Sequence, residues 1–321
     1  MSRPRVYMAR KIPEKIWMPY KDQWDIQMWP YEDLPVSRTE LFQQLKQADA
    51  IFTTLTDVVD QELMDNGKHL KIIANMAVGY DNIDVEYAHK KGIIVTNTPD
   101  VLTESTADLT FALLLAAARR LVEANQYIRE DKWTTWSPLF MAGTDVHHKT
   151  IGIVGMGRIG EAVAHRAKGF HMNVLYHNRR RRPDAEKRIG ATYVPFEDLL
   201  EQSDFVVCMT PLTRETEGLF DRKAFQKMKH TAIFINTSRG GTVNEQDLYE
   251  ALKEGKILAA GLDVFQHEPI GKDHPLLQLD NVTALPHIGS ATKDTRYQMM
   301  KLALENIELV LNGKKPKTPV T

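Results

Sequence analysis

The chain has 321 residues, more than one compact core ordinarily holds, which predicts about two domains. Hydrophobic residues make up 43% and charged residues 26%, a balance typical of folded globular proteins and unlike that of disordered or fibrous chains. The formal net charge of −1 provides no long-range field toward nucleic acid or an anionic membrane, so small ligands are the expected partners.

Cysteine content and apolar runs bear on where the chain resides. A single cysteine, Cys208, excludes an internal disulfide framework and fits a reducing compartment. The basic N-terminus precedes no apolar core of signal-peptide length, and the longest apolar run, near residues 113–118, is too short to cross a bilayer. We therefore expect a cytoplasmic protein that binds neither membrane nor nucleic acid, and we expect no metal at its site.

The first hundred residues alternate short β-rich runs with helical stretches, which predicts a parallel sheet. Helices are expected over residues 37–47, where Ser37 is a capping-type start, and over 83–91, which Gly92 ends. The expected strands cover residues 6–9, 50–55, 72–75 and 93–96.

Residues 104–127 are dominated by Ala and Leu and are apolar on nearly every face up to Arg119. This pattern predicts one linking helix buried between domains or subunits. An aromatic, irregular stretch follows over residues 133–143. At the end of the chain, a helix over 294–312 has an apolar side and is expected to return to pack on the first domain.

A second alternation of strands and helices begins at Lys149 and predicts a doubly wound sheet, whose ligands bind outside the carboxyl ends of the strands. Its six expected strands cover residues 150–154, 173–177, 205–210, 232–237, 259–264 and 282–285. We therefore predict an α/β fold with two doubly wound parallel-sheet domains. A Rossmann dinucleotide-binding domain over 100–289 is inserted in a flavodoxin-like substrate-binding domain made of 1–99 and 290–321.

The string GMGRIG, residues 155–160, follows an apolar strand and opens a helix. In that setting Gly155 permits a tight turn, Gly157 lets the backbone reach a pyrophosphate, and Gly160 lets helix and strand approach. The helix N-terminus adds N–H groups and partial positive charge for phosphates. The loop predicts a dinucleotide site, the alternative being an ordinary strand-to-helix turn.

The next strand ends in His177, Asn178, Arg179 and Arg180, without the acidic residue that would hold a ribose 2′-hydroxyl. Arginines there can bind a 2′-phosphate through charge-assisted bonds, so we predict that NADP(H) is preferred and NAD(H) is a second option. Asn178, Arg179 and Arg180 are the expected cofactor residues. For Arg181 and Arg182 a solvated charged turn is the favoured interpretation.

Arg239, Glu268 and His287 each follow a different neighbouring strand of the second sheet. Hydride transfer to a 2-keto acid needs a cation for the carboxylate and carbonyl, and an acid that protonates the forming alkoxide. Arg239 suits the first task and His287 the second, and Glu268 would orient the imidazole and favour its protonated form. A lone residue of these types is usually structural, but three complementary ones at adjacent strand ends favour catalysis.

The chain resembles the D-isomer-specific 2-hydroxyacid dehydrogenase family over nearly its whole length. The resemblance lies in the glycine loop and in the strings NMAVGYDNID (75–84), NTSRGGTVNEQDL (236–248), AAGLDVFQHEP (259–269) and LPHIGSAT (285–292). It implies that Arg239, Glu268 and His287 are the catalytic set. It also implies that the N–H groups of Val78 and Gly79 hold the substrate carboxylate.

By the same resemblance Asp263 lies by the nicotinamide, and further residues line the cofactor cleft between the domains. These are Thr106, Arg158, Ile159, Pro211, Thr216, Thr237, His287 and Gly289. Each has a plain alternative as a loop or cap residue: Val78–Gly79 as a turn before a helix, and Asp263 as a strand-end cap. Ser290 either contacts the substrate or caps the last helix, and both remain open.

Within the family, the WTTW string at 133–136 and the arginines of 179–182 most resemble glyoxylate and hydroxypyruvate reductases. In such enzymes the linking helix forms a dimer interface, so a homodimer is expected. Trp136 either reaches a partner's substrate pocket or is packed in the interface. The predicted reaction reduces glyoxylate to glycolate or hydroxypyruvate to D-glycerate.

Other activities remain as alternatives. Another D-2-hydroxyacid, phosphoglycerate or phosphite dehydrogenase would keep a similar trio, although formate dehydrogenases of this lineage carry Gln where Glu268 stands. A dinucleotide-sensing, corepressor-like protein is the alternative from another class.

Overall fold

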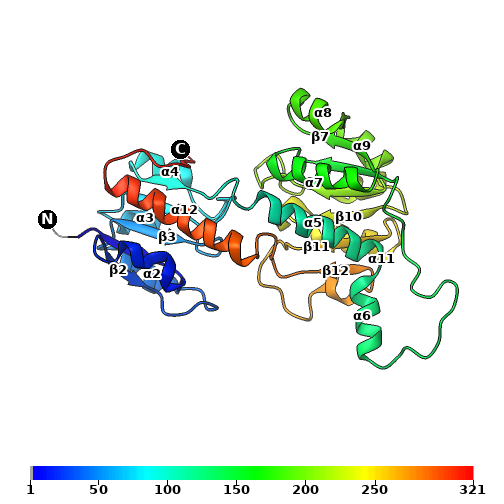
Figure 1. Cartoon of the computed structure of the whole chain (residues 1–321), viewed down its shortest axis with the longest axis horizontal. Coiled ribbons are helices and arrows are strands. Elements are labelled where there is room, and N and C mark those ends of the chain that lie inside the picture. Colours follow the sequence, from blue (N-terminus) through cyan, green and yellow to red (C-terminus); the bar gives the residue numbers. More distant parts are fainter. Residues whose placement is uncertain (1–2, 321) are drawn as a thin grey trace. The chain divides into compact units, whose positions relative to one another are not determined.

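The computed structural model describes residues 3–320, and its chain divides into two compact units. Unit 1 comprises Met1–Leu102 and Ala291–Thr321, and unit 2 comprises Thr103–Ser290. The sequence placed these boundaries after residues 99 and 289. Each unit is an α/β layer structure with its own sheet and its own core (Figure 1).

Unit 1 is built on a parallel five-stranded sheet in the order β2-β1-β3-β4-β5, the flavodoxin-like order. The strands are β1 (Arg5–Met8), β2 (Asp25–Met28), β3 (Ala50–Thr53), β4 (Ile72–Asn75) and β5 (Ile94–Thr96). The helices are α1 (Glu14–Trp17), η1 (Met18–Tyr20), α2 (Arg38–Leu45), α3 (Gln61–Asn66), α4 (Val85–Lys90) and α12 (Lys293–Leu311).

The core of unit 1 follows from the two-residue period of its strands. Tyr7, Ile51, Ile73 and Val95 point to one face and form a cluster with the apolar sides of α2, α3 and α4. Helix α12 contacts β3, β4 and α1, which confirms that the last helix returns to the first domain. Because helices cover both faces, the central strands are buried along their whole length.

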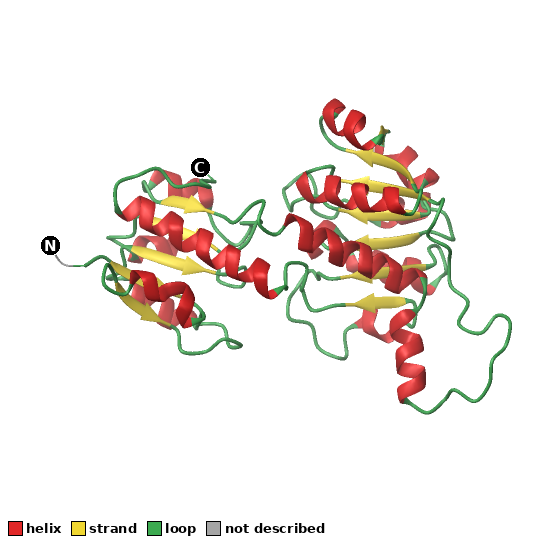
Figure 2. Ribbon diagram, viewed as in Figure 1, coloured by secondary structure: helices red, strands yellow, loops and turns green. Residues whose placement is uncertain are grey.

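Unit 2 has a parallel seven-stranded sheet in the order β12-β11-β10-β9-β6-β7-β8, which is the Rossmann order with an added strand (Figure 2). Its strands are β6 (Thr150–Val154), β7 (Asn173–His177), β8 (Thr192–Tyr193), β9 (Phe205–Cys208), β10 (Ile233–Asn236), β11 (Ala259–Leu262) and β12 (Val282–Ala284). The helices are α5 (Thr103–Ala118), α6 (Leu121–Arg129), α7 (Arg158–Gly169), α8 (Pro183–Ile189), α9 (Phe196–Gln202), α10 (Arg222–Lys227), η2 (Gly240–Thr242), α11 (Glu245–Lys253) and η3 (Pro275–Gln278).

Two apolar clusters cover the faces of this sheet. One joins Ile153, Val207 and Ile235 to α5, α7 and α8, and the other joins Val206 and Phe234 to α9, α10 and α11. The predicted fold class is therefore confirmed: two doubly wound parallel-sheet units, with the Rossmann unit inserted in the flavodoxin-like one.

The single helix predicted over residues 104–127 is wrong. Helix α5 ends at Ala118, and Arg120 adopts the left-handed conformation (φ 53°) before α6 begins. A left-handed arginine cannot continue a right-handed helix, so the chain turns there. The apolar residues Leu121, Val122 and Ile128 of α6 are consequently exposed rather than buried.

Two short strands at sheet edges, β2 and β8, were not predicted. Strand β2 reads DIQM and is largely half-exposed, so it lacks the apolar run by which its neighbours are recognised. Strand β8 has only two residues, Thr192 and Tyr193, paired with β7. Neither strand carries a periodicity long enough to detect.

Candidate active site

The three strands that precede Arg239, Glu268 and His287 are neighbours in unit 2. Strands β10, β11 and β12 pair in parallel in that order, so the loops after them leave the same edge of the sheet. Arg239 starts the short helix η2 after β10, Glu268 lies in the loop after β11, and His287 follows β12. The fold therefore places the three predicted side chains at one edge.

His287 and Glu268 form the central contact of this edge, with 2.6 Å between imidazole Nδ1 and carboxylate Oε2. The other carboxylate oxygen accepts the Phe265 N–H at 2.9 Å. Burial acts to raise the Glu268 pKa, but the bond and charge of His287, the Phe265 N–H and the charge of Arg239 together lower it. Glu268 is therefore an ionised carboxylate that holds the imidazole by one nitrogen and leaves Nε2 for another partner.

His287 itself has a strained backbone, with φ at 53°. Asp263 holds this conformation: its carbonyl accepts the His287 N–H at 2.9 Å, and its carboxylate Oδ1 accepts the Ile288 N–H at 2.8 Å. Asp263 is fully buried, and burial raises the pKa of its carboxyl group. Its second oxygen, Oδ2, is buried without a hydrogen-bond partner among residues 3–320.

The glycine loop connects β6 to α7 at the same edge. Gly155 has φ 107°, and a Cβ there would lie 2.6 Å from the carbonyl group of Met209, so another residue would be strained and crowded. A Cβ on Gly160 would collide with the Gly155 carbonyl oxygen, whereas Gly157 faces open space. Gly157 also precedes α7 without a side-chain cap. The first N–H groups of α7 are thus directed to a ligand position.

The polar loop after β7 divides into two functional parts. Asn178 Oδ1 accepts the Met156 N–H at 2.6 Å and so fixes the glycine loop. Arg181 pairs with Glu186 at 2.7 Å and Arg182 with Glu161 at 2.7 Å, which fits the interpretation of a charged turn. By contrast Arg179 and Arg180 are exposed and form no salt bridge within residues 3–320, although the charge of Arg179 helps to lower the pKa of Glu215.

Two of the predicted cofactor residues, Thr106 and Gly289, lie close to Asp263. A Cβ on Gly289 would meet Asp263 Oδ2 and the Thr106 side chain, at 3.3 and 3.4 Å. The hydroxyl of Thr237 lies 2.6 Å from that of Thr110, on the same helix as Thr106. Arg158 and Ile159 open α7, and the Thr216 hydroxyl donates to the Pro211 carbonyl at 2.6 Å.

A dinucleotide fits these residues, because the polar groups that would receive it are present and prearranged. The open face at Gly157 and the uncapped start of α7 match a pyrophosphate. The buried Oδ2 of Asp263 lies close to Gly289 and makes no hydrogen bond within residues 3–320, so it would accept one from a carboxamide N–H₂. Arg239 and His287 are polar groups that would be available to a substrate at the same edge of the sheet.

In unit 1, Val78 and Gly79 lie in the loop between β4 and α4. Their N–H groups donate no hydrogen bond within the described part of the chain. Their carbonyls are both occupied: Asn97 Nδ2 donates to the Val78 oxygen at 2.8 Å, and Asn75 Nδ2 to the Gly79 oxygen at 2.9 Å. Sequence reasoning missed both asparagines, although each lies at or just beyond the end of a strand, where a polar residue is a signal.

The structure also bears on two further predictions, Ser290 as a helix cap and Trp136 as a site residue. Thr292, not Ser290, caps α12, because its hydroxyl accepts the Thr295 N–H at 3.2 Å. The interpretation of Ser290 as a helix cap is therefore wrong. Trp136 is 75% exposed and lines a hollow with residues of α6, away from the other predicted site residues.

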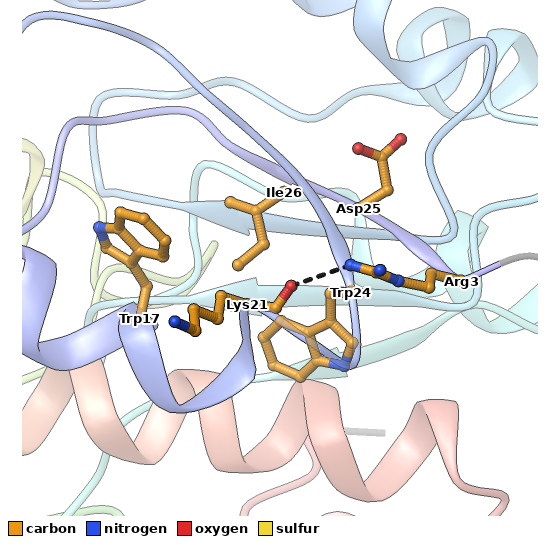
Figure 3. Close-up of a pocket in the computed structure, with 6 residues that line it drawn as sticks. All are labelled: Arg3, Trp17, Lys21, Trp24, Asp25 and Ile26. Atoms are coloured by element: carbon orange, nitrogen blue, oxygen red, sulfur yellow. Dashed lines mark hydrogen bonds between the residues drawn. The ribbon is translucent and has the colours of Figure 1, made fainter.

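A hollow of about 460 Å³ lies on unit 1, at the amino ends of β1 and β2. Figure 3 shows the Arg3 guanidinium reaching the Lys21 carbonyl beside the ring of Trp24, with the ring of Trp17 on the other side of the hollow. None of the predicted site residues lines it, and parallel strands place their ligands at the opposite, carboxyl ends. We therefore do not assign the proposed chemistry to this hollow.

Comparison with known proteins decides the family. The family model described as D-isomer specific 2-hydroxyacid dehydrogenase, NAD binding domain, matches residues 111–289. The chain belongs to this family. The 2-hydroxyacid dehydrogenase described here is 50% identical to a glyoxylate reductase of Korarchaeum cryptofilum (strain OPF8) over 315 residues, 98% of this chain and 95% of that protein.

Solved structures of similar proteins share the whole fold of this dehydrogenase. A protein of Thermus thermophilus has a TM-score of 0.92 and 43% identity, covering 99% of this chain and 100% of its own. An NADPH-dependent glyoxylate/hydroxypyruvate reductase of Sinorhizobium meliloti, in complex with NADP and malonate, has a TM-score of 0.86 and 33% identity, covering 100% of this chain and 97% of its own. Among residues 3–320, no helix is long and apolar enough to cross a membrane.

Proposed function

We propose that this dehydrogenase reduces glyoxylate to glycolate and hydroxypyruvate to D-glycerate, with NADPH as the preferred reductant. The observation that carries the proposal is the 2.6 Å contact between His287 and an ionised Glu268 beside Arg239. The glyoxylate reductase of K. cryptofilum, half of whose residues are identical, supports the same substrate class.

Each site residue has a defined task in this proposal. His287, held at Nδ1 by Glu268, donates the proton on Nε2 to the substrate oxygen as the carbonyl becomes an alcohol. Arg239 binds the carboxylate and polarises the carbonyl, and the N–H groups of Val78 and Gly79 bind the carboxylate. Ser290 is left as a substrate contact.

The reduced nicotinamide, when bound, supplies the hydride that adds to the carbonyl carbon. Gly157 and the N-terminus of α7 would hold the pyrophosphate, and Asp263 Oδ2 would accept from the carboxamide. Arg179 and Arg180 would bind a 2′-phosphate, because both are exposed and neither forms a salt bridge within residues 3–320; Arg179 acts on Glu215 only through its charge. The remaining proposed lining residues are Thr106, Arg158, Ile159, Pro211, Thr216, Thr237 and Gly289.

One panel of assays tests this function. The purified protein is given glyoxylate, hydroxypyruvate, pyruvate or phosphohydroxypyruvate with NADPH and with NADH, and phosphite with each oxidised cofactor. We expect the highest kcat/KM for glyoxylate or hydroxypyruvate with NADPH. A highest value for phosphohydroxypyruvate or phosphite would replace the proposed substrate. Failure of every keto acid would favour a dinucleotide-sensing, corepressor-like protein.

We further propose that the functional particle is a homodimer. Its interface would be formed by α6 and the loop of residues 130–142, which together we call the arm. The arm extends away from the sheet of unit 2 (Figure 2) and exposes Trp136 and Leu139 at 75% and 82%. A hollow of about 220 Å³ in it is lined by apolar side chains, among them Tyr127, Ile128 and Phe140. So much apolar surface on one segment matches an interface with a second copy.

Two further proposals concern the role of Trp136 in the arm and residence of the protein in the cytoplasm. Trp136 either enters the partner's substrate pocket or packs within the interface, and Trp136→Ala with unchanged substrate preference and unchanged stability would remove the first role. Residence in the cytoplasm is supported by the single, free and buried Cys208.

A further inference from the structure

The loop that carries Val78 and Gly79 is connected through Asn97 to residues near the C-terminus. We call residues 316–320 the C-terminal tail. It runs along the free edge of β5, where Thr96 and Pro319 form an antiparallel bridge and the Val320 N–H donates to the Val95 carbonyl at 2.8 Å. The tail therefore covers an edge that would otherwise expose unpaired backbone groups.

Thr318 is the centre of this tail. Its hydroxyl donates to the Asn97 carbonyl at 2.6 Å and accepts from Asn306 Nδ2 at 2.8 Å. The Asn97 N–H in turn donates to the Thr318 carbonyl at 3.3 Å. Asn306 is fully buried in α12, and its Oδ1 accepts the Lys317 N–H at 2.7 Å, so the tail is fastened to a helix that packs on β3 and β4.

Asn97 continues this chain of contacts to the substrate loop. Its side-chain amide donates to the Val78 carbonyl at 2.8 Å, and the next residue, Thr98, donates its N–H to the Ala77 carbonyl at 2.8 Å. The hydrogen bond to the Val78 carbonyl therefore fixes the plane of the Val78–Gly79 peptide. Because a peptide group is planar, the direction of the Gly79 N–H is fixed as well.

We infer that Asn97, held in place by Thr318, is a positioning residue that aims the Gly79 N–H at the substrate carboxylate, while the Thr98 N–H orients the peptide that carries the Val78 N–H. The inference rests on the proposed function. It makes the C-terminal tail a determinant of keto-acid affinity, since the hydroxyl of Thr318 holds the main chain of Asn97 while the Asn97 side chain bonds the Val78 carbonyl. If the tail had only a structural role, it would stabilise unit 1 without changing the KM for the keto acid relative to the KM for NADPH.

The experiment compares Thr318→Val, which keeps the side-chain shape and removes the hydroxyl, with Thr318→Ser, which restores the hydroxyl. Lys317→Ala is the matched control, because its ammonium pairs only with Glu305 at 2.8 Å among residues 3–320. In full-length protein we measure KM for glyoxylate, KM for NADPH, kcat and Tm. Thr318→Val loses both hydrogen bonds of the hydroxyl, the one to Asn97 and the one from Asn306. We expect it to raise the glyoxylate KM about threefold to tenfold, with the NADPH KM unchanged.

Thr318→Ser and Lys317→Ala should both retain the wild-type glyoxylate KM. The inference is overturned if Thr318→Val leaves that KM unchanged, or raises both KM values together, or if Thr318→Ser shows the same increase. A lower Tm without a change in glyoxylate KM would likewise overturn the inference, because it would show that the tail has only a structural role. These results differ from failure of the proposed function, in which the wild-type protein itself would reduce no keto acid.

Discussion

Glu268 is the residue whose surroundings most directly set the pH dependence of the proposed reaction. His287 and Phe265 bond its two oxygens, and its pKa lies below the ordinary 4.5. A lowered carboxyl pKa means that the stabilisation from the ionised carboxylate is fully present above the ordinary value and is lost only as the pH falls through the lowered one. Across neutral pH, therefore, Glu268 contributes a constant negative charge beside the imidazole.

Replacing that charge predicts a shift of the pH profile. Glu268→Gln keeps the size of the side chain and removes the charge that favours the protonated imidazole, so the alkaline limb of kcat/KM should move to lower pH. We also expect kcat to fall, by about 10-fold to 100-fold, as the positioning of His287 weakens. The measurement is the rate of glyoxylate reduction between pH 5 and about pH 10.

Glu245→Gln is the control for this variant. Glu245 also accepts a backbone N–H, that of Gln266 at 2.6 Å, and also faces a histidine, His274 at 3.4 Å. It should leave the alkaline limb in place. An unmoved limb in Glu268→Gln, or an equal shift in both variants, would argue against the pairing.

Cofactor choice is predicted to depend on Arg179 and Arg180. The double variant Arg179→Ala/Arg180→Ala should lower the ratio of kcat/KM for NADPH over NADH by about tenfold or more, because two charge-assisted contacts to a 2′-phosphate are lost. Steady-state kinetics with both cofactors measures the ratio. Arg181→Ala, whose guanidinium is engaged by Glu186, is the control that should not change it. A ratio that stays constant in the double variant would remove these arginines from phosphate binding.

At the scale of elements, α6 illustrates where sequence periodicity is insufficient. The Ala- and Leu-rich pattern of residues 104–118 predicted a buried helix, and α5 packs against α7, β10 and β11. The continuation to 127 failed because the left-handed Arg120 redirects the chain, a conformation that no periodicity encodes. The apolar residues beyond that turn face outward, as an interface segment does when its partner is another chain.

The arm is therefore the place to test the proposed dimer. Leu139 is 82% exposed at its tip, and Leu139→Asp should weaken self-association without unfolding the subunit, because no core contact is removed. Sedimentation equilibrium over a range of concentrations should give a dimer for the wild-type protein and a shift toward monomer for the variant. Leu258→Asp, at a leucine that is 44% exposed elsewhere on unit 2, is the control. A wild-type monomer, or a variant dimer as strong as the wild type, would contradict this interface.

Over the whole molecule, the sequence predicted what depends on local pattern. Buried apolar strands such as β4 and β9, the glycine loop, and polar residues at strand ends were identifiable because their neighbours along the chain define them. Arg239, Glu268 and His287, the proposed catalytic residues, could be grouped because parallel strands direct all three to one edge.

Contacts between residues far apart in the chain could not be predicted in the same way. The hydrogen bond from Thr318 to Asn97 joins residues separated by 221 positions, and the polar tail that carries it resembles any exposed terminus. Similarly, the orphaned oxygen of Asp263 depends on its burial by packed neighbours. Such features require the folded chain.

The measurement that tests the central claim most directly is glyoxylate reduction by NADPH in the wild-type protein and in His287→Gln, with the Kd for NADPH determined for both. We predict that the wild-type protein turns over glyoxylate and that His287→Gln loses about 10² to 10⁴ in kcat while its NADPH Kd stays within about threefold. The account would be contradicted if no 2-keto acid supported NADPH oxidation by the wild-type protein. It would also be contradicted if His287→Gln remained as active as the wild type.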